Sequence, residues 1–400
     1  MFAKLWKDGD RRARRMGPTR GLKRRPFVES LEGRQLLSLG PEAILPVNTT
    51  TRNAQLDADT ASSANGSSVT VWVDTFSPTD RDIRGQRFDA AGNKVGPEMI
   101  VSFSSLDETE PAVAMDARGD FVVTWTQIIP NVDENVVAQR FDAAGNKLGG
   151  VIPIGSGTFR EHASDVAMDS AGRFTVTYVR DTNNNNPDVF AKQYDTFGNL
   201  LNVVNVSISA TRPEFNPSIA MSPDGRFDVA WEEAFSSSDH DIRMNSYAPN
   251  GMLTNTFALA VGTTYESTPS IAMDNFGNSV TAWAVLGNGG NDIKARRVSS
   301  TGIAGPVLNI ANTSDNEAAP SVAMKRGGGS FAVAYDSDAG SRLQVLVAEV
   351  SATNVVTTLD AGQPRFTPSI SIDGFDNYMV VYTALRGQDL NIHSRRGHLN

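Results

Sequence analysis

Short apolar segments rich in Val, Ala and aromatic residues alternate along this chain with polar turns, and the pattern recurs about every 50 residues. The clearest copy has a small, apolar segment at 111–116, a turn at 117–120 and a β-branched and aromatic segment at 121–125. A third segment follows at 136–142, and a fourth begins after the turn at 143–146. The pattern predicts four antiparallel strands per copy, joined as a meander.

One aromatic residue per copy occupies the same place in the second predicted strand. These anchors are Trp72, Trp125, Tyr178, Trp231, Trp283, Tyr335 and Tyr382, separated by 53, 53, 53, 52, 52 and 47 residues. Constant spacing is expected where each sheet packs on both neighbours, because the anchors must then fall at matching depths. We therefore predict an all-β, seven-bladed β-propeller with four-stranded antiparallel blades over residues 41–400.

The two ends of the repeat array complement each other. The last copy stops before a fourth strand, whereas Gly40–Leu45 echoes Gly96–Val101, which begins the fourth strand of the first copy. We predict that residues 41–49 supply the outer strand of the last blade. Closure of this kind removes the unpaired sheet edges that an open array would expose.

Charge is distributed unevenly. The chain has a net charge of -9, yet residues 1–40 carry eleven Lys or Arg against four Asp or Glu. The acidic remainder argues against nucleic acid as a partner. There are no cysteines, which excludes disulfides and thiolate metal sites, and no apolar run is long enough for a transmembrane helix. Residues 1–39 are expected to be a basic leader, disordered or partly helical.

The leader contains a short motif at Phe27–Ser38, with the sequence FVESLEGRQLLS. It resembles the LEPR-XLL motif of exported bacterial surface proteins, although Val28 is inserted and Gly33 stands at the proline position. The resemblance covers about twelve residues. It implies an extracellular or cell-surface location and no particular activity.

A second resemblance concerns the blades. The segment Pro217–Arg226 (PSIAMSPDGR), followed by Val229–Trp231, is similar to the blade motif of TolB-type (PD40) propellers. The motif is weaker in the other copies, where Met-Asp-x-x-Gly replaces Ser-Pro-Asp-Gly. Propellers with such blades serve as binding platforms or as accessory domains of enzymes.

Aspartates recur in the predicted turns and before the third strands. The turn series comprises Asp89, Asp116, Asp142, Asp169, Asp195, Asp224 and Asp274; the second series comprises Asp82, Asp188, Asp241, Asp292 and Asp389. Calcium prefers such oxygen ligands, but none of these segments has the spacing of a calcium-binding loop. Aspartate beside Gly or Asn in a turn usually accepts hydrogen bonds from its own backbone. We expect structural roles and no cofactor, with calcium as the alternative.

The candidate ligand site is on the face formed by the loops after the second strands and between blades. Its residues are predicted to be Asp188, Asp239, His240, Asp241, Phe215 and Tyr265, with the aromatic rings available to stack on sugars. The leading hypothesis is a monomeric, non-catalytic scaffold that binds polysaccharide or a cell-envelope protein. The alternative is a glycan-active hydrolase or lyase using carboxylates at the channel mouth. A deep central pocket with convergent carboxylates, one of raised pKa, would favour the enzyme.

Overall fold

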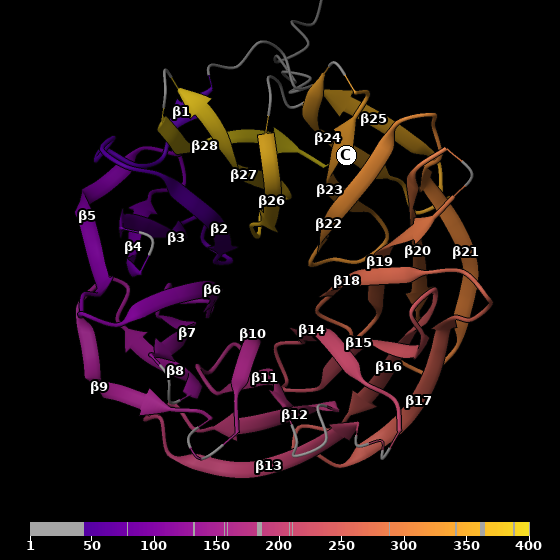
Figure 1. Ribbon diagram of the computed structural model, residues 1–400, viewed down its shortest axis with the longest axis horizontal. Coiled ribbons are helices and arrows are strands. Elements are labelled where there is room, and N and C mark those ends of the chain that lie inside the picture. The colour runs from indigo at the N-terminus through magenta and orange to yellow at the C-terminus, as the bar shows by residue number, and fades with distance from the viewer. Residues whose placement is uncertain are drawn as a thin grey trace, which may run out of the picture. The chain divides into compact units, whose positions relative to one another are not determined.

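The computed structural model describes residues 44–399, except 78, 131–132, 156, 158, 182–185, 208, 210, 288, 341, 361–364 and 387–388. These residues form seven four-stranded antiparallel sheets and no helix, arranged as blades around a central axis (Figure 1). The predicted seven-bladed propeller is confirmed. The predicted leader at 1–39 and its LEPR-XLL-like motif lie outside the described residues.

Each blade begins at the axis and ends at the rim. Blades one to four comprise β2 (Gln55–Ser62), β3 (Ser68–Ser77), β4 (Asp80–Phe88), β5 (Lys94–Ser102); β6 (Asp107–Met115), β7 (Phe121–Ile129), β8 (Asp133–Phe141), β9 (Lys147–Pro153); β10 (Glu161–Met168), β11 (Phe174–Asp181), β12 (Pro187–Tyr194), β13 (Leu200–Ser207); and β14 (Glu214–Met221), β15 (Phe227–Ser236), β16 (Asp239–Tyr247), β17 (Leu253–Ala260). Blades five to seven comprise β18 (Glu266–Met273), β19 (Ser279–Leu286), β20 (Asn291–Val298), β21 (Ala304–Ala311); β22 (Asn316–Met324), β23 (Phe331–Asp338), β24 (Leu343–Val350), β25 (Val356–Asp360); and β26 (Arg365–Ile372), β27 (Asn377–Arg386), β28 (Asp389–His398), β1 (Leu45–Pro46).

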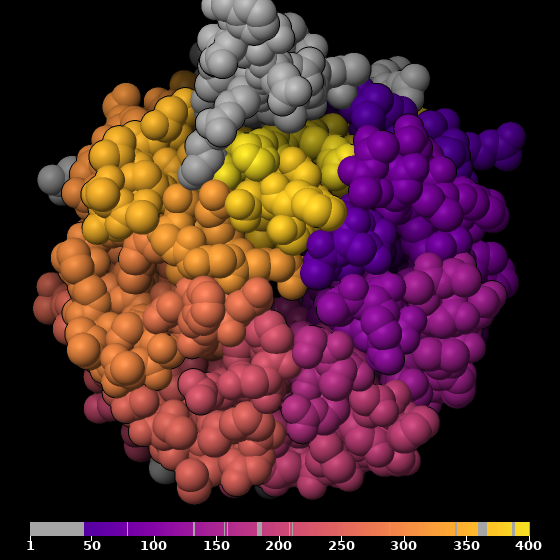
Figure 2. All heavy atoms as spheres, turned by 180° about the vertical axis from the view of Figure 1, so that it is seen from behind, coloured from indigo at the N-terminus to yellow at the C-terminus, as the bar shows by residue number. Residues whose placement is uncertain are grey.

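Strand β1 closes the ring, as predicted. Leu45 and Pro46 pair antiparallel with β28, and the amide of Val47 donates to the carbonyl of Ile392 at 2.8 Å. The space-filling view shows the last blade in yellow lying beside the first in indigo (Figure 2). The strand is shorter than the predicted 41–49: residues 44 and 47–49 are described but are not part of it, and residues 41–43 are outside the described range.

The anchors are buried between neighbouring sheets. Six of the seven are at most 2% exposed, and Trp231 is 4% exposed. The start of the second strand adds a stacked pair with the end of the third, as in Phe121 and Phe141, whose ring centroids are 4.8 Å apart. Such offset aromatic pairs add stability beyond the area they bury. The spacing of the anchors in the sequence therefore corresponds to one buried layer of side chains, with one anchor from each blade around the axis.

Replacing Trp125 tests this layer. Trp125→Ala is expected to lower the free energy of unfolding by about 3–5 kcal/mol, because the neighbouring blades cannot fill the cavity. Trp125→Phe should cost less, since the indole Nε1 has no hydrogen-bond partner among the described residues. Urea unfolding followed by circular dichroism measures both losses. Equal losses for the two variants would contradict this account.

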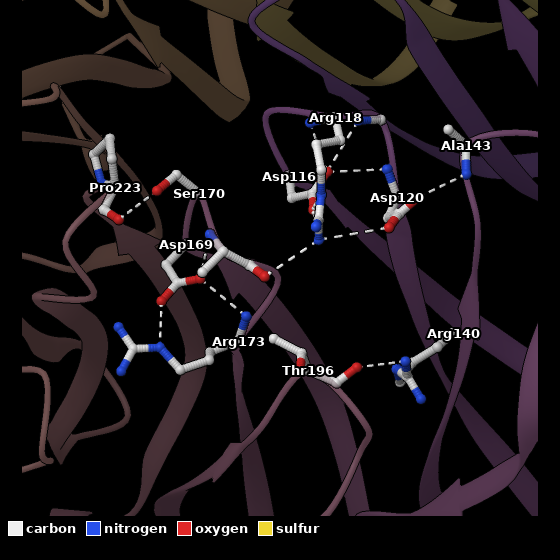
Figure 3. Close-up of polar contacts among 12 residues, drawn as sticks. Asp116, Arg118, Asp120, Arg140, Ala143, Asp169, Ser170, Arg173, Thr196 and Pro223 are labelled. Atoms are coloured by element: carbon white, nitrogen blue, oxygen red, sulfur yellow. Dashed lines mark hydrogen bonds and ion pairs between the residues drawn. The ribbon is translucent and has the colours of Figure 1, made fainter.

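Polar contacts also join neighbouring blades at the end of the channel where first and second strands meet in hairpins, here called the hairpin face. Arg118 pairs with Asp116 at 2.9 Å and donates to the carbonyl of Ala171 in the next blade at 3.3 Å (Figure 3). Ser170 likewise donates to the carbonyl of Pro223 at 2.9 Å. The acceptors Asp116, the carbonyl of Ala171 and the carbonyl of Pro223 are thus occupied by the protein itself.

Candidate functional site

The opposite end of the channel, here called the connection face, carries the links between blades and the loops between second and third strands. A cavity of about 440 Å³ opens there, lined by the first strands of all seven blades. Its size lies in the range of small-ligand sites in proteins. The candidate ligand residues were predicted on this same face.

A β-bulge interrupts every first strand where it lines this cavity. The bulged residues have positive φ between 48° and 53°: Asp57, Glu110, Ala163, Asn216, Thr268, Ala319 and Thr367. None is glycine, and such backbone conformations persist only where surrounding contacts hold them. Carboxylates of the preceding blade provide three of these contacts, by accepting the amide of the bulged residue. The pairs are Ala163 to Glu110 at 2.8 Å, Thr268 to Glu232 at 3.2 Å and Thr367 to Asp336 at 3.0 Å.

Two residues after the bulge, Ser or Asp in six of the seven blades forms a belt of hydrogen bonds around the channel. Each of these side chains accepts an amide of the next blade; the contacts are Val113 to Asp59, Ile219 to Asp165, Ile271 to Ser218, Val322 to Ser270, Ile370 to Ser321 and Thr60 to Ser369. Ala112 occupies this place in blade two, and there the amide of Val166 donates instead to Asp165 of its own blade. The belt explains the recurring Pro-Ser pairs in the sequence.

The two carboxylates of the belt are electrostatically unusual. Desolvation raises the pKa of Asp59, and desolvation together with the charge of Asp59 raises that of Asp165 to about 6. Raised carboxyl pKa values in a pocket are a feature of catalytic acids, but buried structural networks produce them too. Both side chains here hold the neighbouring blade, so we assign them a structural role.

Four side chains on blades four and five form a cluster that is not part of the belt. His240 at the start of β16 bonds through Nδ1 to Oε1 of Glu232 on β15 at 2.5 Å. The ring of Tyr265 lies 4.1 Å from the imidazole centroid, and that of Phe215 is stacked 6.4 Å away. Glu232 and His240 are buried, whereas Phe215 and Tyr265 are partly exposed. We call Phe215, Glu232, His240 and Tyr265 the aromatic–histidine cluster.

Glu232 fixes the orientation of the imidazole. Its second oxygen accepts Nδ2 of Asn216 at 2.9 Å and the amide of Thr268. Held in this way, the carboxylate keeps Nδ1 of His240 as a donor and leaves Nε2 as the basic nitrogen. Burial, followed by the nearby charge and hydrogen bond of Glu232, raises the pKa of Tyr265. The phenol therefore stays protonated at neutral pH, and the same shift makes it a weaker acid than an exposed tyrosine.

The predicted site residues divide into two groups. Phe215, His240 and Tyr265 come together, whereas two of the predicted aspartates are tied to structure: Asp188 and Asp241 accept the amides of Ser209 at 3.2 Å and Gly262 at 3.3 Å. Asp239 lies opposite Ser236 where β16 begins, and its Oδ1 is buried without a hydrogen-bond partner among the described residues.

Sequence reasoning missed Glu232, although one signal was present. The residue after the anchor is Val73, Thr126, Val179, Ala284, Asp336 or Thr383 in the other blades. Only blade six matches the acidic side chain, and the residue at the position of His240 there is not a histidine. A charged residue after the anchor, in the blade that also has a histidine before the third strand, was the available clue.

The turn aspartates behave as their sequence context suggested. The carboxylate of Asp116 accepts the amides of Arg118, Gly119 and Asp120 within its own turn. Asp142 does the same with Asn146, and these hydrogen bonds lower the pKa of its carboxyl group. In the part of the chain that the structure describes, no group of three or more Asp, Glu or His is arranged to hold a metal ion. The described residues also include no helix suited to crossing a bilayer.

The fold is similar to those of solved carbohydrate-directed proteins. An ulvan lyase bound to -[GlcA(1-4)Rha3S]- matches with a TM-score of 0.55 and 9% identity, over 90% of this chain and 96% of that one. The Penicillium chrysogenum alpha-L-arabinanase gives 0.52 and 14%, over 78% and 100%. The leech intramolecular trans-sialidase gives 0.55 and 7%, over 80% and 70%. At these identities the likeness shows the fold alone.

No family model matches the chain, and no curated protein matches it in sequence. The resemblances to TolB-type blades and to the LEPR-XLL motif are therefore not confirmed, while the propeller itself is.

Proposed function

We propose that this propeller binds an acidic carbohydrate polymer across the connection face of blades four and five and cleaves it there. The observation that carries the proposal is the aromatic–histidine cluster, in which a buried carboxylate orients an imidazole against a tyrosine. The same carboxylate, Glu232, bonds Asn216 and Thr268, which line the channel cavity. A base held by a carboxylate next to a proton donor is a common arrangement for general acid–base chemistry. The fold-level similarity to carbohydrate-directed proteins supports the choice of substrate by analogy.

The groups available favour elimination over hydrolysis. Hydrolysis of a glycosidic bond normally uses two carboxyl groups facing the bond, whereas this cluster contains one, already hydrogen-bonded through both oxygens. In elimination, Nε2 of His240 takes the proton from the carbon next to a uronate carboxylate. The electron pair forms a carbon–carbon double bond, the glycosidic C–O bond breaks, and Tyr265 protonates the departing oxygen.

Positive charge is available for the acidic groups of such a polymer. Arg212 and Arg243 both lie over the ring of Phe235 in blade four, at 4.2 and 5.6 Å from its centroid. Both also pair with Glu233, at 3.2 and 2.7 Å. Arg212 is the more exposed, so it is the better placed to contact a substrate carboxylate. A polymer substrate agrees with the export that the leader suggests.

Recognition without cleavage is the second candidate, and one observation favours it. Glu232 has a structural equivalent in blade six, Asp336, which supports the bulge at Thr367 without any histidine. Glu232 could therefore serve the bulge alone, leaving Phe215 and Tyr265 as a stacking surface for sugars.

The test is incubation with a panel of uronate-containing and neutral polysaccharides, measuring new reducing ends and the ultraviolet absorbance of unsaturated products. We expect unsaturated products from an acidic polymer, and a loss of about 10²-fold or more in rate for His240→Ala and Tyr265→Phe. Glu232→Gln should lose rate as well, while Asp336→Asn, which changes the equivalent bulge support, should not.

Two outcomes would contradict the proposal that the cluster cleaves an acidic polymer. Binding of a polymer without products, abolished by Tyr265→Ala, would replace cleavage with recognition. Neither binding nor products from any acidic polymer would overturn the proposal.

A further inference from the structure

The hairpin-face end of the channel contains a second cavity, of about 450 Å³. Its wall consists mainly of methionine and alanine side chains at the ends of the first strands. The methionines are Met115, Met168, Met221, Met273 and Met324, one from each of blades two to six. The connection-face cavity lies at the beginnings of these strands, so the two cavities occupy opposite ends of the channel.

Three charged residues line this cavity: Asp116 and Asp169, which are paired with Arg118 and Arg173, and Arg326, which has no ion-pair partner among the described residues. Arg326, in the hairpin after β22, donates from Nη2 to the carbonyl of Ser62 at 2.7 Å. Its Nε is buried and has no acceptor among the described residues, and no described carboxylate lies within ion-pair distance. The carboxylate oxygens of the nearby Asp373 accept hydrogen bonds from the amides of Phe375 and Asn377 and from the Asn377 side chain.

Two other arginines on the hairpin face form ion pairs, unlike Arg326. Arg118 and Arg173 each pair with the aspartate of their own hairpin, Asp116 at 2.9 Å and Asp169 at 2.6 Å. Both are also more exposed to water than Arg326, whose guanidinium is sufficiently buried that desolvation lowers its pKa. Arg326 itself is half-buried, and the nearby charge of Asp373 partly offsets its desolvation without forming an ion pair. Because desolvated charges in proteins are normally paired, Arg326 is a site where an anion from a ligand would be stabilised.

We propose that the hairpin-face cavity binds a small amphiphilic carboxylate, with the carboxylate on Arg326 and its alkyl chain among the methionines. Methionine side chains are flexible and polarizable, so a ring of them can adapt to an alkyl chain of irregular conformation. The cavity volume fits a ligand of this size. The guanidinium fork suits a carboxylate geometrically, through two parallel N–H donors. This site is independent of the function proposed for the connection face.

The probe is sodium decanoate, titrated by calorimetry into the full chain below the concentration at which it forms micelles. We expect saturable binding of one equivalent. In Arg326→Met the affinity for decanoate should fall tenfold or more, whereas the affinity for the neutral decanol should not fall. Arg226→Met is the matched control, because it removes a guanidinium in a hairpin of the same face whose partner, Asp224, does not line the cavity; its decanoate affinity should equal that of the unaltered protein.

A second variant keeps the test decisive if Arg326→Met does not fold. Ala117 lines the cavity from an exposed position in its hairpin, so Ala117→Trp should obstruct the cavity without repacking the blades. It is expected to lose decanoate binding while unfolding normally. The absence of decanoate binding to the unaltered protein, or equal binding in Arg326→Met or Ala117→Trp, would overturn the proposal.

Discussion

Deleting residues 1–49 is expected to lower the free energy of unfolding by about 5 kcal/mol or more, which is much of the stability of an ordinary domain. The deletion removes Val47, fully buried beside Trp72 and Ile392, and burial of such a side chain contributes about 1.5–3 kcal/mol. It also removes Asn48, which is 2% exposed. Its side chain bonds Thr50, Gln55 and Asn391 and accepts the amide of Ile392. Each such hydrogen bond contributes about 0.5–1.5 kcal/mol.

The deletion also exposes β28 as an unpaired edge, and exposed edges promote association between chains. We therefore expect a lower urea midpoint together with concentration-dependent association by light scattering. Deletion of residues 1–43 is the matched control, because it leaves β1, Val47 and Asn48 in place, and it should unfold like the full chain. Asn48→Ala alone should cost about 2–4 kcal/mol. Equal stability of the two deletions would refute closure by this strand.

The second large effect is expected on changing pH: stability should fall by several kcal/mol between pH 4 and pH 8. Burial raises the pKa of Asp228 to about 6 and that of Asp336 to about 7, from 3.8. Between these values the folded protein retains protons that the unfolded chain has released. Stability is therefore complete below about pH 4 and is lost as the pH rises through the folded pKa values. The shift of Asp336 is about three pKa units, and one unit corresponds to about 1.4 kcal/mol, so Asp336 alone accounts for about 4 kcal/mol.

Asp336→Asn isolates this contribution. The amide oxygen can still accept from Thr367, but the side chain no longer ionises. Urea unfolding at pH values from 4 to 8 should show the variant equal to the unaltered protein at pH 4 and about 4 kcal/mol more stable at pH 8. Asp142→Asn is the control: its exposed carboxyl has a lowered pKa, so it should gain nothing at pH 8. A slope unchanged by Asp336→Asn would disprove the assignment.

The candidate site was only partly predictable from the sequence. Phe215, His240 and Tyr265 were named because they occupy loops of one face, and the structure places them in one cluster. The aspartates named with them were chosen for their charge, but Asp188 and Asp241 fix connections between blades. Glu232 was overlooked because its position in a buried strand implied packing. Glu232 can orient an imidazole only because the fold places His240 beside it, and the local sequence around Glu232 does not show that contact.

The sequence by itself determined the number of blades, the depth of each anchor and the closure of the ring, because these follow from a period and from strand patterns that are local. Only the tertiary structure decided which side chains of neighbouring blades meet. The bulges at the channel, the belt through Ser218 and Asp165, and the unpaired charge of Arg326 depend on strand register and on burial. Both are properties of the packed ring, in which residues some 50 positions apart become neighbours.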